Sequence, residues 1–176
     1  NFPRSSRSHP ACYIDVTVTV PCSGTLKLMF RSDINQHEND ESWAFQNVKI
    51  TAPAVAAPSP PVVSYKEAQA VGTGWSNTEI TTAGSAGKVH GPWGNNNRVA
   101  SKNIPLPAGV TQCTVSWRSW AIYTRDGEYD YAYINGKQVW KKRGYHSGCR
   151  NGWRTGPRNF PRSSRSHPAC YIDVTV

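Results

Sequence analysis

Two pairs of acidic residues stand just before segments with strand character. Asp126 and Glu128 flank Gly127 ahead of one such segment, and Asp40 and Glu41 precede another. Carboxylate oxygens on loops are the ligands that Ca²⁺ takes up in proteins. No cofactor is required, and we favour the interpretation that these acids are solvated turn residues or partners of the many arginines. The alternative is that they are ligands of a structural calcium ion.

Nothing in the sequence indicates catalysis. A pair of carboxylates hydrolyses glycosidic bonds only at a defined separation, and sequence spacing does not fix that separation here. The five histidines lack metal-ligand spacing, and no Gly-x-Ser-x-Gly, Cys-His or phosphate-loop pattern occurs. We predict that the protein is not an enzyme.

A second candidate site combines arginine with aromatic rings. Basic and aromatic residues alternate between Lys141 and Arg165. Such a patch can contact a neighbouring module or an anionic glycan, and the alternative is a solvated face with arginine stacked on tryptophan. Trp93, in a glycine-rich loop, is the ring expected to be most exposed. The predicted contact residues are Trp93, Trp120, Arg143, Tyr145, Arg150 and Trp153.

The first eighteen residues of the chain recur at its end. Residues 1–18 and 159–176 are identical, so the sequence re-enters itself after 158 residues. A fixed period of this kind indicates a tandem array of modules. The alternative is an artificial permutant with overlapping ends.

Residues 53–63 form the only low-complexity stretch, which is rich in Pro and Ala and has no charge. This composition favours an extended, semi-rigid spacer. We therefore predict a module boundary there. Residues 1–52 would be the C-terminal part of one module, and 64–176 the N-terminal part of the next.

The cysteines indicate disulfides and an extracellular location. One repeat period holds four of them, because Cys12 and Cys170 occupy the same repeat position. An even count without a Cys-x-x-Cys pair favours two disulfides over a metal site. Three pairings are open, and we expect Cys149 with Cys170 and Cys113 with the Cys22 position. The predicted disulfide cysteines are Cys12, Cys22, Cys113, Cys149 and Cys170.

The composition and periodicity predict an all-β fold. The chain has seven Trp, eight Tyr and a net charge of +9, with abundant turn residues and no convincing amphipathic helix. Asn135-Gly136 predicts a type I′ hairpin. Nine short strands favour an antiparallel β-sandwich of jelly-roll type. The predicted strands are 13–20, 24–30, 43–50, 68–72, 78–82, 101–106, 110–123, 128–134 and 138–142.

Two stretches of the sequence share one order of residues. The segments that begin at Cys22 and at Cys113 each run Cys, strand, Arg-Ser, loop, acidic pair, aromatic residue, Ala and a β-branched end. Two similar hairpins placed symmetrically in a sandwich would produce this order. It suggests a weak internal duplication.

The motifs Asp40-Glu41-Ser42-Trp43 and Asp126-Gly127-Glu128, with the segments around them, resemble tandem repeats of large extracellular surface glycoproteins of protists and algae. This resemblance implies a jelly-roll or galactose-binding-like sandwich with a surface role. Separately, the Pro-rich stretch resembles the hydroxyproline-rich spacers of algal wall and flagellar glycoproteins. It implies proline hydroxylation and O-glycosylation at Pro53, Pro58, Ser59, Pro60 and Pro61.

Together these features predict a structural repeat unit of a secreted, disulfide-stabilised filament or cell-surface array. Its partners would be copies of itself, and glycans are candidates as well. The alternative is a lectin-like carbohydrate-binding module of a surface glycoprotein. The secreted context argues against a nucleic-acid partner, and no membrane span occurs in the sequence.

Overall fold

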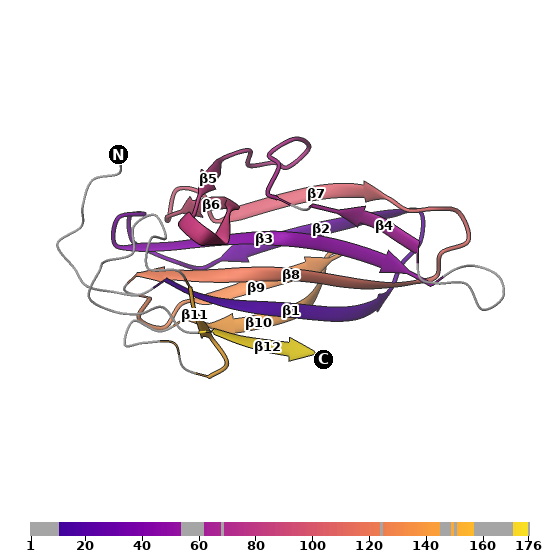
Figure 1. The fold of residues 1–176 in the computed structure, drawn as a ribbon. Helices are drawn as coiled ribbons and strands as arrows, with labels where there is room; N and C mark the ends of the chain where they lie inside the picture. Colours follow the sequence, from indigo (N-terminus) through magenta and orange to yellow (C-terminus); the bar gives the residue numbers. More distant parts are fainter. Residues whose placement is uncertain are drawn as a thin grey trace.

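A computed structural model describes residues 11–53, 62–67, 69–123, 125–144, 149, 151–156 and 171–175. These residues form two β-sheets packed face to face (Figure 1), which confirms the predicted all-β sandwich. The larger sheet has the order β11-β1-β8-β3-β6-β5, with β12 beside β1 and β4 beside β3, and the smaller sheet has the order β10-β9-β2-β7. No helix in the described part of the chain is long and apolar enough to cross a membrane.

The strands of the larger sheet are β1 (Ala11–Pro21), β3 (Glu41–Ala52), β4 (Val62–Lys66), β5 (Ile80–Thr82), β6 (Lys88–Trp93), β8 (Gln112–Tyr123), β11 (Arg154–Thr155) and β12 (Tyr171–Thr175). Those of the smaller sheet are β2 (Thr25–Ser32), β7 (Val99–Pro105), β9 (Tyr129–Ile134) and β10 (Lys137–Arg143). A 3-10 turn, η1, spans Gly84–Ala86.

Alternation along the strands decides which side chains fill the space between the sheets. In β2 every second residue is buried, from Leu26 to Ser32, as a strand with one covered face requires. The interior is mainly aromatic: the Phe30 and Phe45 ring centroids lie 4.4 Å apart, and Trp75 lies 4.8 Å from Phe45. The core thus joins rings from β2, from β3 and from the loop that contains Trp75.

The two stretches of similar sequence form two arches that each cross from one sheet to the other. The first runs from β2 in the smaller sheet to β3 in the larger one, and the second from β8 in the larger sheet to β9 in the smaller one. β3 pairs with β8 and β2 pairs with β9, both antiparallel. The expected symmetric placement is therefore present, with arches in place of hairpins. That the two stretches arose by duplication stays a prediction.

The Pro- and Ala-rich stretch joins two paired strands in this chain. β3 ends at Ala52, and β4 begins at Val62, opposite Ala52 in the antiparallel register. Val62 and Val63, placed in the spacer by the sequence, therefore belong to the sheet. Strands from both sides of the stretch form one sandwich. Whether the stretch separates modules in a longer array stays a prediction.

Some predicted strands are correct and others are not. The Asn135-Gly136 hairpin is confirmed: both residues have positive φ, 50° and 82°, and they connect β9 to β10. The strand predicted at 68–72 is wrong, because residues 69–72 have no strand pairing. β6 was missed because it contains Gly91 and Pro92, which ordinarily interrupt strands.

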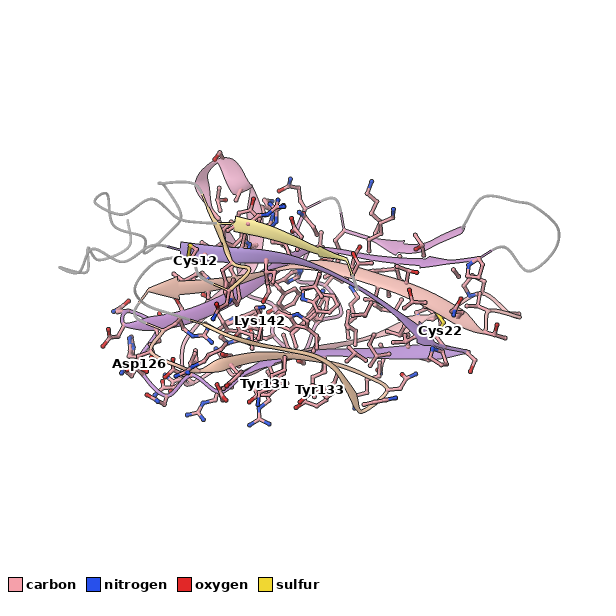
Figure 2. The ribbon with its side chains drawn as sticks, turned by 90° about the horizontal axis from the view of Figure 1, so that it is seen from below. Cys12, Cys22, Asp126, Tyr131, Tyr133 and Lys142 are labelled. Carbon is pink, nitrogen blue, oxygen red and sulfur yellow. A yellow bond between two sulfur atoms is a disulfide. The ribbon has the colours of Figure 1, made fainter. Side chains whose placement is uncertain are left out.

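Two disulfides close the sandwich toward opposite ends, as the positions of Cys12 and Cys22 in Figure 2 show. Cys22 is bonded to Cys113, as predicted. Cys149 is bonded to Cys12 and not to Cys170, which lies outside the described residues. Cys12 and Cys170 occupy the same repeat position. The predicted position was therefore correct, but the partner of Cys149 comes from the first copy of the repeat and not from the second.

We expect the paired substitutions Cys22→Ala and Cys113→Ala to lower the free energy of unfolding by about 2–4 kcal/mol, since the bond closes a long loop in the unfolded chain. Urea denaturation followed by tryptophan fluorescence measures this change. Ser23→Ala, at the exposed neighbouring position, serves as the control. An unchanged denaturation midpoint in the double variant would show that the bond does not restrain the unfolded chain.

Candidate functional site: an acidic cluster at one end of the sandwich

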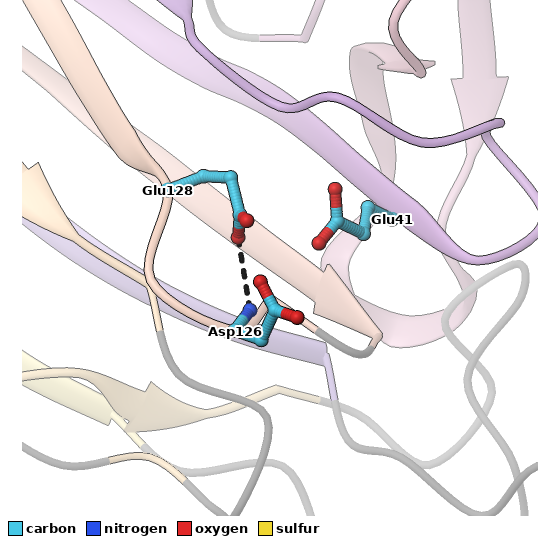
Figure 3. A group of neighbouring side chains, drawn as sticks. All are labelled: Glu41, Asp126 and Glu128. Carbon is cyan, nitrogen blue, oxygen red and sulfur yellow. Dashed lines mark hydrogen bonds between the residues drawn. The ribbon is translucent and has the colours of Figure 1, made fainter.

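Three of the four candidate calcium ligands come together. Glu41, Asp126 and Glu128 each direct a carboxylate oxygen to a place where these atoms lie within 4.8 Å of one another (Figure 3). Glu41 begins β3, whereas Asp126 and Glu128 lie in the loop between β8 and β9. The cluster therefore lies where the two arches turn. Asp40 is not part of it.

The loop between β8 and β9 is shaped by Gly127. Its φ is 146°, a conformation that residues with a side chain rarely adopt, so glycine is favoured there, and a Cβ would also lie 2.4 Å from Nη2 of the exposed Arg143 side chain. The tight loop lets Oε2 of Glu128 accept hydrogen bonds from the backbone N–H groups of Asp126 (2.9 Å) and Gly127 (3.1 Å). Glu128 is thus held by its own loop, with Asp126 exposed beside it.

Arg125, which is fully buried, is hydrogen-bonded to this loop and to the start of β9. The Arg125 guanidinium donates to Asp130 Oδ1 at 3.1 Å and to the Glu128 carbonyl at 3.3 Å. Its Nε lies 3.8 Å from Glu128 Oε2 and has no hydrogen-bond partner among the described groups. Burial of the Glu128 carboxyl alone would raise its pKa, but hydrogen bonding with Asp126 and the charge of Arg125 outweigh this and lower the pKa.

Glu41 is in the opposite situation. Its side chain is fully buried, and Oε2 accepts long hydrogen bonds from the backbone N–H groups of Asn35 and Gln36, both at 3.3 Å. Oε1 has no partner among the described residues. Burial, and then the neighbouring Glu128 carboxylate, raise the pKa of Glu41 to about 7. At neutral pH the Glu41 carboxyl is therefore either protonated or, if ionised, stabilised by a nearby cation.

The donor set fits a hard divalent cation. Three carboxylates on two separate elements supply oxygen ligands, and the unpartnered Oε1 of Glu41 is buried at the edge of the cluster. Ca²⁺ takes six to eight oxygens, so waters on the exposed side of Asp126 would complete the shell. The two buried carboxylates, Glu41 and Glu128, would hold the ion, and Asp126 would close the site.

The sequence analysis missed a second buried polar group. Glu67, which directly follows β4, accepts hydrogen bonds from Trp75 Nε1 (2.9 Å) and from the Tyr65 hydroxyl, and its Oε2 lies 2.7 Å from His90 Nε2. Burial alone would raise the pKa of Glu67, but these hydrogen bonds outweigh it and lower the pKa. Lys102 Nζ lies 3.8 Å from the same carboxylate. The network ties β4, β6 and β7 to the core.

The predicted tryptophan contacts are wrong. Trp93 is fully buried, and its ring centroid lies 4.9 Å from that of Trp43. Trp120 is fully buried against Tyr13 and donates to Gln46 Oε1 at 3.1 Å. Each ring is covered by strands or turns that are distant in sequence, which composition could not reveal.

Of the remaining predicted contact residues, the structure describes Trp153 and Arg143. Trp153 is buried and donates to the backbone carbonyl of Arg143 at 2.7 Å, whereas the Arg143 side chain is exposed on β10. Tyr145 and Arg150 lie outside the described residues. Of the glycosylation candidates, Pro53 is exposed after β3, and Pro58, Ser59, Pro60 and Pro61 lie outside the described residues.

Comparisons of this chain with protein-family models, with curated proteins and with solved structures found no match.

In the presence of EDTA, we expect the free energy of unfolding to fall as the pH rises from about 4.5 to 7. The unfolded chain releases the Glu41 proton at an ordinary pKa, while the folded chain retains it up to about pH 7. Glu41→Gln, which cannot ionise, should remove on the order of 2 kcal/mol of this fall. Urea denaturation at both ends of this range measures it, with Glu79→Gln as an exposed control. Equal slopes for wild type and Glu41→Gln would contradict the assignment.

Calcium should stabilise the fold through the same cluster. At about a hundredfold excess over Kd we expect the melting temperature to rise by roughly 5–10 °C. Asp126→Asn should abolish most of the rise, because it removes a charged ligand at an exposed position. Asp40→Asn is the matched control, since Asp40 adjoins Glu41 in sequence but lies outside the cluster. Equal losses in both variants would exclude this site.

Proposed function

We propose that this chain is a non-enzymatic structural repeat unit of a secreted filament or cell-surface array. The observation that carries the proposal is the course of the repeated segment. Residues 11–18 of the first copy form most of β1 inside the larger sheet, and each of them pairs with β8. The second copy forms β12, which pairs with β1 in parallel from Tyr13↔Tyr171 to Thr17↔Thr175. After completing one sandwich, the chain therefore begins the same strand again.

The arrangement of the unit supports this role. β1 to β11 span residues 11–155, so one 158-residue period is long enough to form one sandwich. The short segment between β11 and the second copy of β1 is basic, with Arg158, Arg162 and Arg165. Such units strung end to end form a chain of rigid beads with short connectors.

The covalent framework suits work outside the cell. Two disulfides close the sandwich, and disulfides persist in oxidising compartments. They would keep each unit folded where no chaperone can rescue it. The acidic cluster would add a calcium ion as a further staple, since the concentration of this ion is high outside cells.

A protein of three consecutive periods tests the proposal. We expect an elongated particle whose radius of gyration by small-angle X-ray scattering increases almost in proportion to the number of periods. Electron micrographs should show evenly spaced beads. Single-period and two-period proteins are the matched controls, and high salt removes charge repulsion as a cause of extension. A compact three-period particle, growing only with the cube root of its mass, would refute a linear array.

A further inference from the structure

The outer face of the smaller sheet carries a ladder of tyrosine rings. Tyr129, Tyr131 and Tyr133 alternate in β9 with the buried Asp130, Ala132 and Ile134. Their side chains therefore lie on the side that faces away from the larger sheet, as Figure 2 shows for Tyr131 and Tyr133. Successive ring centroids are 6.3 Å apart. The rings form a continuous row along the strand.

Cations border this row on both sides. Lys141 of β10 has its Nζ 4.0 Å from the Tyr129 ring centroid and 5.3 Å from that of Tyr131. From β2, the guanidinium of Arg31 lies 5.8 Å from the Tyr131 centroid, and Lys27 is exposed on the same side of the strand. Among the described residues, none of these three cations forms an ion pair. Their charges are available to an external partner.

Asp33 is hydrogen-bonded to two residues of the tyrosine row. Asp33 accepts a hydrogen bond from the Tyr131 hydroxyl at 2.8 Å and another from the backbone N–H of Tyr129. This contact raises the pKa of Tyr131 to about 12, after the effect of burial, so the hydroxyl stays protonated. The Tyr131 ring is thus held in place before any ligand arrives, which lowers the entropy lost on binding.

We propose that this surface, the tyrosine face (Lys27, Arg31, Tyr129, Tyr131, Tyr133 and Lys141), binds an anionic polysaccharide. Ring faces offer a platform for the apolar faces of sugar rings, and the flanking cations match carboxylate or sulfate groups on either side of the polymer. A regular row of rings suits a polymer of regular units. The proposal does not depend on the array function.

Two other kinds of partner fit less well. A second copy of the chain offers few free carboxylates, because Glu67, Glu128 and Asp130 are engaged inside the fold. A nucleic acid would suit rings and cations, but the two disulfides place the protein in an oxidising compartment where nucleic acid is not the usual partner.

Binding of polygalacturonate, a uronate polymer, tests the proposal by isothermal titration calorimetry in EDTA, which removes any contribution from the calcium cluster. We expect binding that weakens with salt, and no binding of neutral dextran. Tyr133→Leu, which keeps apolar volume but removes the ring, and Lys141→Gln should each weaken binding about tenfold. Lys88→Gln, at an exposed lysine of the larger sheet, should leave it unchanged. Circular dichroism confirms that each variant is folded.

Four outcomes would overturn the proposal. They are no binding of polygalacturonate by the folded protein, full affinity in Tyr133→Leu, equal losses in Lys88→Gln and Lys141→Gln, and tighter binding of oligo(dT) than of polygalacturonate. The second and third outcomes would reduce the effect to general charge attraction. The fourth would assign the face to nucleic acid.

Discussion

At one end of the sandwich, the buried carboxylates of Glu41 and Glu128 lie close together, and the packing of this end depends on how their charges are compensated. Pairing β3 with β8 and β2 with β9 requires the two arches to turn side by side, and the turns carry Glu41 and Glu128. Both cannot be ionised there without compensation. The positive charge of Arg125 is already paired with Asp130 and Glu128. The Glu41 carboxyl must therefore be neutralised by a proton or by a bound cation. The two arches therefore pack side by side when Glu41 is either protonated or paired with a cation.

The internal use of carboxylates also shapes the charge of the surface. The sequence has 20 Lys and Arg but 11 Asp and Glu, and several of the acids serve as internal acceptors. Glu67 receives side chains from β4, β6 and the Trp75 loop, while Asp33 holds the β9 tyrosines. Carboxylates thus organise the interior, and most basic residues are left at the surface. A net positive exterior follows from how the fold is built, before any partner is considered.

Local patterns were sufficient to predict the sandwich and the β9–β10 turn, because alternation and turn chemistry act over a few residues. The Cys22–Cys113 bond joins residues 91 apart and was one of three open pairings. The acidic cluster was partly predictable, since both arches showed the same acid-before-strand order. Which member of the Asp40 and Glu41 pair would take part was not predictable, because the sequence does not show that β3 begins at Glu41 and leaves Asp40 in the preceding turn. Trp93 was misjudged for a related reason. Its cover comes from Trp43, fifty residues earlier in the chain.

The Cys12–Cys149 bond has a mechanical consequence for units joined in series. It spans 137 residues of each 158-residue period, so a pulling force would pass through the sulfur atoms and bypass the strands between them. Only the difference, 21 residues per period, could lengthen under load. A thread made of such units would have a fixed maximum extension that survives even if a sandwich unravels. Its toughness would then be set by redox chemistry and not by the strength of the β-sheets.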